Sequence, residues 1–284
     1  MAISPDPVPR GPVVANINFA HAPGPGQKAI NYVEDPPAGE PKRNVAVNQQ
    51  EVRIEDIRGR ESQFNLDTDA FAAYSNVPES AEKDFADDAS IAKNYYPEVE
   101  KFLLDNIPGS NKIVIFDHTV RRAEPNAKRQ AVYNAHIDQT PLSAPQRVRK
   151  HLPEEADRLL QGRYRIINVW RPLNKGPVES NALAFASSST FGTEDAIPVE
   201  HRYPNGYTGQ TAAIAHNPKQ KWYYWSGMTG DERLLLECFD SEGLKDGSGV
   251  KGGRVPHTAF VDPRTPDGAE GRESIEVRAL VFGP

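Results

Sequence analysis

The stretch Tyr133-Asn134-Ala135-His136-Ile137-Asp138-Gln139-Thr140 places a histidine and an aspartate two residues apart near the middle of the chain. Side chains alternate between the two faces of a β-strand, so on a strand His136 and Asp138 point the same way. Two histidines and one carboxylate are the ligand set of non-haem Fe(II) oxygenases. Because a His-x-Asp tripeptide alone is common, a metal site at this position requires a second histidine from elsewhere in the chain.

The composition restricts the chain to a few classes of protein. Its 284 residues are 38% hydrophobic and 25% charged, which is typical of globular proteins. A net charge of −6 without a long basic run argues against nucleic-acid binding, and no apolar stretch approaches the ~20 residues of a membrane span. Residues 1–12 lack the apolar segment of a secretory signal, and Cys238 is the only cysteine. An intrachain disulfide is therefore impossible, and we predict a cytoplasmic protein.

Short β-strands are the main elements expected from residue 112 onward. The run Lys-Ile-Val-Ile-Phe-Asp-His at 112–118 is typical of a buried strand, and a helix with a break at Pro153 is expected over 143–160. Residues 221–226 and 233–239 are expected to form a hairpin. Further strands are expected at 165–170, 183–186, 200–203, 254–260 and 274–282.

The N-terminal third has a different pattern. Residues 13–19 and 53–57 favour short strands, residues 22–48 are rich in proline and glycine and favour a loop, and residues 67–107 favour helices. About eight strands after a helical region predict a mainly β fold, an antiparallel jelly roll (a double-stranded β-helix, or cupin-like barrel) with a helical N-terminal layer. We expect a single domain over 1–284, with the jelly-roll core at about 110–284 and a flexible segment at 1–12.

His257 is the candidate for the third metal ligand. It lies in Val255-Pro256-His257-Thr258-Ala259-Phe260, one strand before the last expected strand, where jelly-roll oxygenases carry their second histidine. His216 is the alternative, but it lies in a turn signal, Ala-His-Asn-Pro, and no basic strand follows it closely. Three other histidines are less suitable, because they lie in the proline-rich arm, ahead of the His-x-Asp strand, or in a charged helical segment: His21, His118 and His151.

Polar side chains alternate along the last expected strand. Arg272, Ser274, Glu276 and Arg278 share one face of it. Charges buried inside a barrel need partners, and an anionic co-substrate would provide one for the arginines. The planar fork of arginine suits a carboxylate, which it binds through two parallel hydrogen bonds. The alternative is a solvated face on which Glu276 pairs with Arg278.

These motifs resemble those of known oxygenases. The spacing from His257 to Arg272-x-Ser274 resembles the distal His…Arg-x-Ser of 2-oxoglutarate-dependent oxygenases related to gibberellin oxidases, and Arg272 with Arg278 resembles the paired arginines of the alkylation-repair dioxygenases. A closer resemblance is to the family that contains a cephem methoxylation protein, fungal gibberellin desaturase-like proteins and a fungal endoperoxide-forming enzyme of meroterpenoid biosynthesis. The segments that carry it are 117–122, 136–140, 168–173, 222–224, 231–232, 239–241, 257–260 and 272–278.

The resemblance implies an Fe(II)- and 2-oxoglutarate-dependent dioxygenase of fungal secondary metabolism. His136, Asp138 and His257 would hold Fe(II), and Arg272 would pair with the C5 carboxylate of 2-oxoglutarate, with Ser274 or Arg278 assisting. O2 would convert 2-oxoglutarate to succinate and CO2, and an iron-centred oxidant would abstract hydrogen from a small natural product. Hydroxylation, desaturation, ring closure and endoperoxidation are all compatible with this chemistry.

Several other residues are candidates for the surroundings of the metal and the substrate. Gln139 and Thr140 follow the ligands and could support them. Arg171, at the end of an apolar strand, is a candidate for binding a carboxylate, and so are Arg121 and Arg122. A further group consists of large apolar side chains whose alternative role is ordinary core packing: Trp170, Tyr223, Tyr224, Trp225 and Met228.

Two other functions are compatible with the same residues. A metal-dependent isomerase or lyase on this barrel would use the histidines and the aspartate but would not need Arg272. A non-catalytic subunit of a two-component modification system would bind the substrate for a second enzyme. The prediction includes a small-molecule substrate, leaves a homodimer open, and expects neither a nucleic-acid nor a membrane partner.

Overall fold

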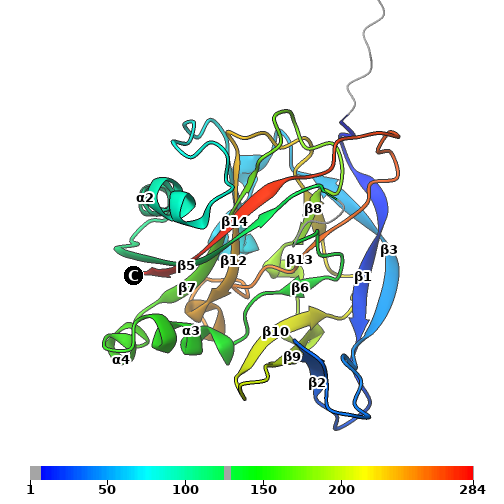
Figure 1. Cartoon of the computed structure of the whole chain (residues 1–284), viewed down its shortest axis with the longest axis vertical. Coiled ribbons are helices and arrows are strands. Elements are labelled where there is room, and N and C mark those ends of the chain that lie inside the picture. Colours follow the sequence, from blue (N-terminus) through cyan, green and yellow to red (C-terminus); the bar gives the residue numbers. More distant parts are fainter. Residues whose placement is uncertain (1–7, 125–128, 284) are drawn as a thin grey trace, which may run out of the picture.

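Two β-sheets face each other in the computed structural model, which describes residues 8–124 and 129–283 (Figure 1). The larger sheet has nine strands and the smaller has five. The larger sheet consists, in spatial order, of β1 (Val13–His21), β3 (Ala46–Asp56), β11 (Trp222–Tyr224), β8 (Leu183–Ala186), β13 (His257–Ala259), β6 (His136–Ile137), β10 (Thr208–Ile214), β9 (Ala196–Arg202) and β2 (Ala29–Tyr32). The smaller consists of β4 (Phe71–Tyr74), β12 (Arg233–Asp240), β7 (Tyr164–Pro172), β14 (Ser274–Phe282) and β5 (Lys112–Arg121).

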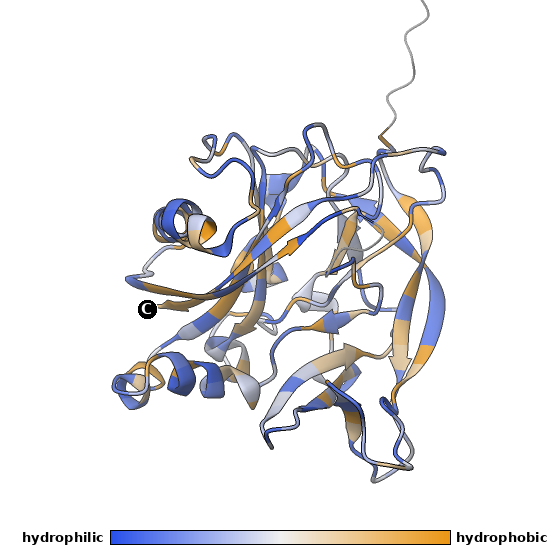
Figure 2. Ribbon diagram, in the orientation of Figure 1, coloured by the Kyte–Doolittle hydropathy of each residue, from blue (hydrophilic) through white to orange (hydrophobic). Residues whose placement is uncertain are grey.

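Neighbouring strands are antiparallel, except for the parallel pairs β3–β11 and β2–β9. Hydrophobic and hydrophilic residues alternate in bands along β1 and β3, as Figure 2 shows, because these strands bury only one of their faces. The predicted architecture, a mainly β jelly roll, is confirmed.

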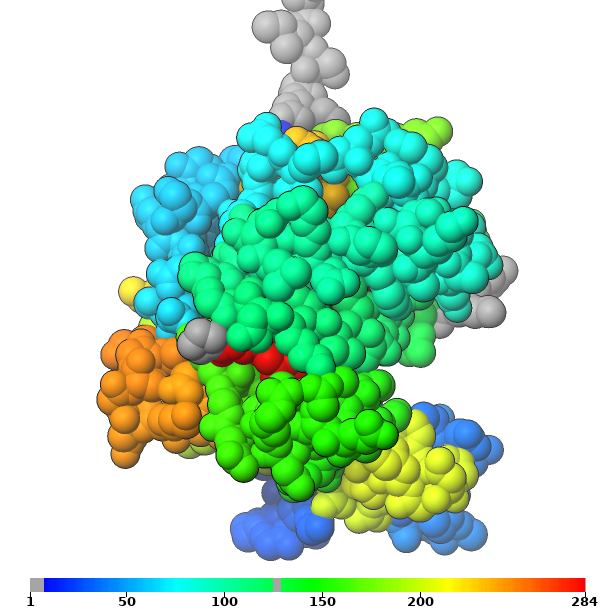
Figure 3. Space-filling view, turned by 90° about the vertical axis from the view of Figure 1, so that its left-hand side faces the viewer, coloured from blue at the N-terminus to red at the C-terminus, as the bar shows by residue number. Residues whose placement is uncertain are grey.

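The helices are α1 (Leu66–Asp69), α2 (Asp88–Asn106), α3 (Ser143–His151) and α4 (Ala156–Leu159), and single 3-10 turns lie at Glu61–Gln63, Ser188–Thr190, Thr193–Asp195 and Ser241–Leu244. Figure 3 shows the α2 region and, below it, the α3 and α4 region covering one side of the molecule. Among the described residues, no helix is both long enough and apolar enough to cross a membrane.

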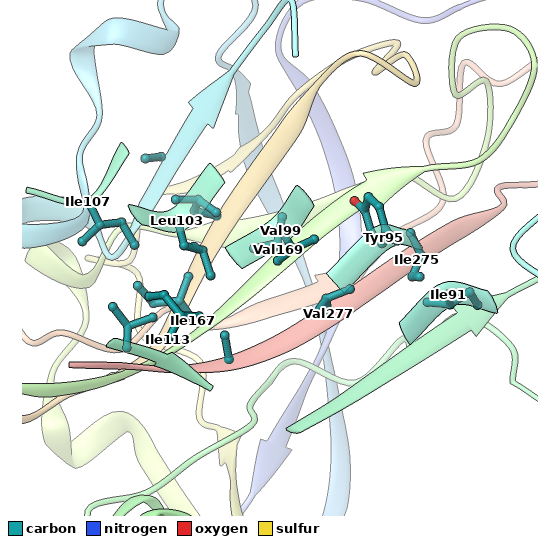
Figure 4. Close-up of a cluster of buried hydrophobic side chains, with 14 of the residues drawn as sticks. Ile91, Tyr95, Val99, Leu103, Ile107, Ile113, Ile167, Val169, Ile275 and Val277 are labelled. Carbon is teal, nitrogen blue, oxygen red and sulfur yellow. The ribbon is translucent and has the colours of Figure 1, made fainter. Parts of the chain in front are cut away.

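Helix α2 covers the outer face of the smaller sheet. A side-chain oxygen of Asp87 accepts a hydrogen bond from the backbone N–H of Ser90 (2.8 Å) and so caps the first turn. Figure 4 shows side chains of α2 against the strands, among them Val169 of β7 and Val277 of β14. Full burial of one such apolar side chain contributes roughly 1.5–3 kcal/mol to stability. The buried residues recur every four positions on one face of the helix: Ile91, Tyr95, Val99 and Leu103.

Strand β14 separates this hydrophobic layer from the interior between the sheets. Ile275 and Val277 pack against α2, so Glu276 and Arg278 point to the opposite face, toward the larger sheet. The polar face that the sequence predicts for this strand is therefore the inner face of the barrel.

Two expectations from the sequence are wrong, both in stretches with many turn-forming residues. The proline-rich stretch 22–48, expected as a loop, contains β2 and the start of β3. The expected hairpin of 221–226 and 233–239 does not form: β11 pairs with β3 and β8 in the larger sheet, whereas β12 pairs with β4 and β7 in the smaller one. Turn residues show that the chain reverses, but they do not show which sheet receives it.

The N-terminal region also differs from expectation. Strand β4 interrupts the stretch that was expected to be helical, and β1 to β3 join the larger sheet, so α2 alone forms most of the helical layer. Residues 1–7 of the segment expected to be flexible lie outside the described residues. Residues 8–12 pack against the body of the protein: Val8 is buried, and the N–H of Gly11 donates to Asp56 (2.8 Å).

Candidate metal centre

His136 and His257 lie side by side on neighbouring strands of the larger sheet. They are directly opposite each other in the antiparallel pair β6–β13, so their side chains share a face. Their ring centroids are 4.4 Å apart. Asp138 follows the short strand β6, and its Oδ1 lies 3.4 Å from Nε2 of His136 and 4.0 Å from Nε2 of His257. One ligand atom from each of the three residues thus lies within 4.8 Å of the others.

Backbone carbonyls fix the protonation of both rings. Nδ1 of His136 lies 2.8 Å from the carbonyl oxygen of Asn134, and Nδ1 of His257 lies 3.2 Å from that of Val255. A carbonyl oxygen only accepts hydrogen bonds, so each Nδ1 carries the proton and each Nε2 is free as a ligand. Such a bond also fixes the orientation of a metal-binding imidazole.

The smaller sheet holds the other oxygen of Asp138. Asn168 on β7 donates to Oδ2 through Nδ2 (2.9 Å), and Arg278 on β14 donates to the same oxygen through Nε (3.3 Å). Oδ1 therefore faces the two histidines while Oδ2 is occupied. Burial opposes ionisation of Asp138, but its close contact with His136 and the positive charge of Arg278 outweigh it and hold its pKa well below the usual range.

A small buried cavity joins these three residues to the inner face of the smaller sheet. Arg272 and Arg121 line it together with Glu276 and Arg278. Arg272 is 7% exposed; its Nη1 donates to the carbonyl of Asn181 (2.7 Å), and its guanidinium lies 5.6 Å from the centre of the Trp170 ring. Burial, and then the nearby charge of Arg121, lower the pKa of Arg272 to about 10.

The arginines of this cavity differ in their partners. Arg278 is engaged by Asp138, by Glu276 and by the hydroxyl of Thr119 (3.0 Å). Among the described residues, neither Arg272 nor Arg121 forms an ion pair with a carboxylate. Two cations without an acidic partner therefore face the same space as the two histidines and Asp138, which favours an anion in that space.

The chain is similar to fungal oxygenases over most of its length. A family model described as an oxidoreductase/YMDC permease-like domain matches residues 17–282. The hydroxylase/desaturase poxK of Penicillium oxalicum is 40% identical over 304 residues, which cover 97% of this chain and 93% of poxK. The Fe(II)/2-oxoglutarate-dependent dioxygenase nvfI of Aspergillus novofumigatus is 33% identical over 263 residues, which cover 90% of this chain and 92% of nvfI.

A solved structure leads to the same group. The iron and alpha-ketoglutarate-dependent endoperoxidase NvfI superposes with a TM-score of 0.85 at 30% identity, over 97% of this chain and 99% of NvfI. The chain belongs to the family of fungal Fe(II)/2-oxoglutarate-dependent oxygenases. The resemblance noted from its motifs is thus confirmed, and this oxygenase is an enzyme that uses Fe(II), 2-oxoglutarate and O2.

The remaining residues predicted for the site of this oxygenase differ in whether they line the cavity of His136, Asp138 and His257. Trp170 lines the same cavity as the ligands. Ser274 is buried on the same face of β14 but does not line the cavity. Gln139 and Thr140 are buried at the start of α3, where the hydroxyl of Ser143 donates to Gln139 (2.9 Å). They hold the segment that follows Asp138.

Arg171 and Arg122 lie outside the metal cavity. Arg171 points to the outer face of the smaller sheet, where its guanidinium lies over the rings of Phe85 and Tyr95, at 5.0 and 5.6 Å. Arg122 forms an ion pair with Glu273 (2.7 Å). Neither of these two arginines is near enough to join Arg272 and Arg121 in one site.

The other apolar candidates pack in the interior and do not line the metal cavity. Tyr223, Trp225 and Met228 belong to a cluster between the sheets that also contains Trp170. Tyr224 packs on the other side, and its hydroxyl donates to the carbonyl of Gly11 (2.6 Å).

The rival histidine, His216, is not part of the group. Its ring lies 4.9 Å from that of Phe19 on β1, and it contributes no atom to the cluster of ligand atoms.

Sequence reasoning gave Asn168 no role and Arg121 only a minor one. Asn168 could have been found, because it is the one amide within the apolar run Ile-Ile-Asn-Val-Trp, and a buried amide in a strand needs a partner. No local pattern singled out Arg121, because two adjacent arginines at the end of a strand are typical of a solvent-exposed strand end. Only the register of β5 against β14, which sets Arg121 opposite Ser274, brings it to the cavity.

Proposed function

We propose that His136, Asp138 and His257 hold Fe(II), and that Arg272 with Arg121 binds the C5 carboxylate of 2-oxoglutarate. The observation that carries the proposal is the pairing of two features in one cavity: a histidine–histidine–carboxylate group and two arginines that form no ion pair with a carboxylate of the described residues. Nitrogen and oxygen ligands on one side of a metal leave positions open for a co-substrate, as in non-haem iron oxygenases. Arg278 is a weaker candidate for the carboxylate, because Asp138 and Glu276 already neutralise it.

The bound iron would supply the oxidation of a substrate C–H bond, coupled to the conversion of 2-oxoglutarate and O2 to succinate and CO2. The protein's own residues do the positioning. Asn168 and Arg278 hold Asp138 with one oxygen toward the metal, and the carbonyls of Asn134 and Val255 orient the imidazoles. The buried side chain of Trp170 helps exclude water from the cavity.

The substrate in this proposal is a small natural product of secondary metabolism. The names of the relatives support it, since they include hydroxylase/desaturases and an endoperoxidase. Hydroxylation, desaturation, ring closure and endoperoxidation all begin with loss of hydrogen from the substrate, and its position relative to the iron would decide among them. A cytoplasmic location and a homodimer remain part of the proposal; the single cysteine, Cys238, supports a reducing compartment.

The test is anaerobic titration of the protein with Fe(II) and then with 2-oxoglutarate, followed by the visible absorption band of the complex. His257→Ala should abolish the band, while His216→Ala, the matched control, should leave it unchanged. Arg272→Gln should retain iron binding but raise the Kd for 2-oxoglutarate at least tenfold, since a charge-assisted hydrogen bond contributes about 1.5–3 kcal/mol. Arg202→Gln, which removes a paired surface arginine, should not.

The same titration distinguishes the proposed oxygenase from the two alternative functions. An isomerase or lyase would bind the metal but show no band with 2-oxoglutarate. Release of succinate in air without added substrate would exclude a non-catalytic subunit. A well-folded His257→Ala protein that still binds iron, with loss of binding in His216→Ala, would overturn the assignment of the ligands.

A further inference from the structure

A second cavity, of about 240 Å³, adjoins the metal centre on the side of His136. It shares His136 and Val132 with the cavity of the proposed co-substrate, so the two spaces meet at a metal ligand. The side chain of His136 is 24% exposed, whereas that of His257 is 5% exposed, so the metal centre is open on this side. The polar residues that line the second cavity are Asn31, Arg43, Asn134, His136, His201 and Thr211.

The pairing of the strands places residues that line this cavity on the same face of the sheet as His136. Ala213 of β10 lies opposite His136, so the two side chains share a face of the sheet. Thr211 precedes Ala213 by two residues on the same strand and therefore projects from that face too. Thr211 lies opposite Val199 of β9, which places His201 on that face as well. The far strand, β2, adds Asn31 next to His201. The inner faces of four strands thus form one continuous wall that begins at the metal ligand.

His201 is a neutral, structural member of this wall. Nδ2 of Asn31 donates to Nδ1 of His201 (3.2 Å), so Nε2 carries the proton and donates to Oγ1 of Thr211 (2.8 Å). Burial, and then the charges of Arg43 and His136, lower the pKa of His201. Because Thr211 accepts this bond, its own hydroxyl hydrogen is free to donate to a bound molecule.

Among the described residues that line this cavity, Arg43 has the only formally charged side chain. Among the described residues it has no acidic partner. The nearby cations differ: Lys28 (2.6 Å) and Arg202 (3.4 Å) both pair with Glu200. The backbone at Arg43 is fixed by a bridge to Asn31 and by the next residue, Asn44, whose side chain accepts from the N–H of Ile30 (2.8 Å) and donates to the carbonyl of Lys28 (2.9 Å). The side chain of Arg43 is exposed at the mouth of the cavity.

We infer that this second cavity receives the organic substrate, and that Arg43 and Thr211 bind a carboxylate at the end of the substrate that lies away from the metal. The substrate class is then a small organic acid, held by its carboxylate at the β2 end with its carbon skeleton against Val199 and Ala213, so that a C–H bond lies near His136. A guanidinium and a hydroxyl match a carboxylate in charge and in hydrogen-bonding pattern. This inference rests on the proposed function, since it requires iron at His136.

The test uses two probes of nearly equal shape, cyclohexanecarboxylate and cyclohexanecarboxamide. The oxygenase is loaded with Fe(II) and saturating 2-oxoglutarate without O2, so that the co-substrate site is filled. Broadening of the probe's proton NMR signals by the paramagnetic iron, compared with the Zn(II)-loaded protein, reports binding near the metal. We expect the acid to bind at least tenfold more tightly than the amide.

Variants then identify the residue responsible. Arg43→Gln should weaken binding of the acid at least fivefold and leave the amide unchanged, and Arg43→Lys should retain part of the preference. Lys28→Gln removes one positive charge from the same region outside the cavity and should change neither Kd by more than twofold. Equal binding of acid and amide, an unchanged preference in Arg43→Gln, or no broadening of either probe at 20 mM would each overturn the inference.

The absorption band of the Fe(II) and 2-oxoglutarate complex is recorded on the same samples. If the band forms and the probes fail, the inference on the substrate is wrong while the proposed function stands. If the band does not form, the proposed function itself fails.

Discussion

Asp138 and Glu237 are both carboxylates in the body of the barrel, Asp138 16% exposed and Glu237 fully buried, and they have opposite surroundings. Asp138 faces the inner side of the smaller sheet and receives hydrogen bonds from Asn168 and Arg278. Burial disfavours its ionisation, but the contact with His136 and the charge of Arg278 keep its pKa well below the usual range. Glu237 lies on the outer face of β12, fully buried, and neither of its carboxylate oxygens has a hydrogen-bond partner among the described residues. Burial, and then the charge of Asp240, raise its pKa well above the usual range.

The difference shows that burial alone does not make a functional carboxylate. Low polarity disfavours the charged form of both groups, and only at Asp138 do the contact with His136 and the positive charge of Arg278 outweigh this effect. The outer face does contain a cation, Arg165, but its Nε and Nη2 are also without partners among the described residues. A metal ligand must be ionised, so the inner face suits Asp138 for that role and the outer face would leave Glu237 protonated.

The largest effect is expected from removal of the donor that holds Asp138. Asn168→Ala should weaken Fe(II) binding 10- to 100-fold, because the carboxylate loses a hydrogen bond that orients it toward the metal. Isothermal titration with Fe(II) under nitrogen measures this. Asn106→Ala, which removes an amide bonded only within α2, is the control and should bind iron normally. Equal affinity of the Asn168 variant would show that Arg278 alone suffices to orient the carboxylate.

A smaller effect, on stability and not on iron, is expected at Glu237. The pKa of Glu237 is higher in the folded protein than in the unfolded chain. Between these two pKa values the folded protein keeps a proton that the unfolded chain has lost. The free energy of unfolding therefore falls as the pH rises through this range. Glu237→Gln removes this dependence. Relative to the parent protein, the variant should gain on the order of 1 kcal/mol or more between pH 4.5 and pH 8. Urea unfolding at both pH values is the measurement, and a constant difference would contradict the raised pKa.

The smallest effect is expected at Arg171, on the same outer face. Arg171→Gln should cost about 0.5–1 kcal/mol of stability, the contribution of its contact with the rings of Phe85 and Tyr95. The Kd values for Fe(II) and 2-oxoglutarate should stay within twofold of the parent. A tenfold weaker affinity for 2-oxoglutarate would instead support the idea, drawn from the sequence, that Arg171 binds a carboxylate.

The sequence predicted those parts of the fold and site that depend on local patterns. Strands β8 and β14 match the expected ranges 183–186 and 274–282, and the spacing of His136, Asp138 and His257 selected the three residues whose ligand atoms meet. Arg272 was selected by alternation on β14, which has one polar face.

The sequence did not predict features that depend on which strands pair with each other, or on strands that are buried on both faces. Strand β7 is buried on both faces, so its sequence does not show that Asn168 points inward and Arg171 outward. Strand β10, which forms a wall of the second cavity, was not expected at all. The position of Arg121 follows from the register of β5, which no local pattern encodes.

The division of the site between two sheets has a mechanical consequence. The imidazoles proposed to hold the iron belong to the larger sheet, while Arg272, the proposed partner of the distal carboxylate, belongs to the segment that enters the smaller one. A 2-oxoglutarate molecule bound at both ends would therefore act as a removable crosslink across the barrel. Turnover shortens that crosslink by one carbon and removes its keto group, so succinate could no longer hold both sheets as tightly.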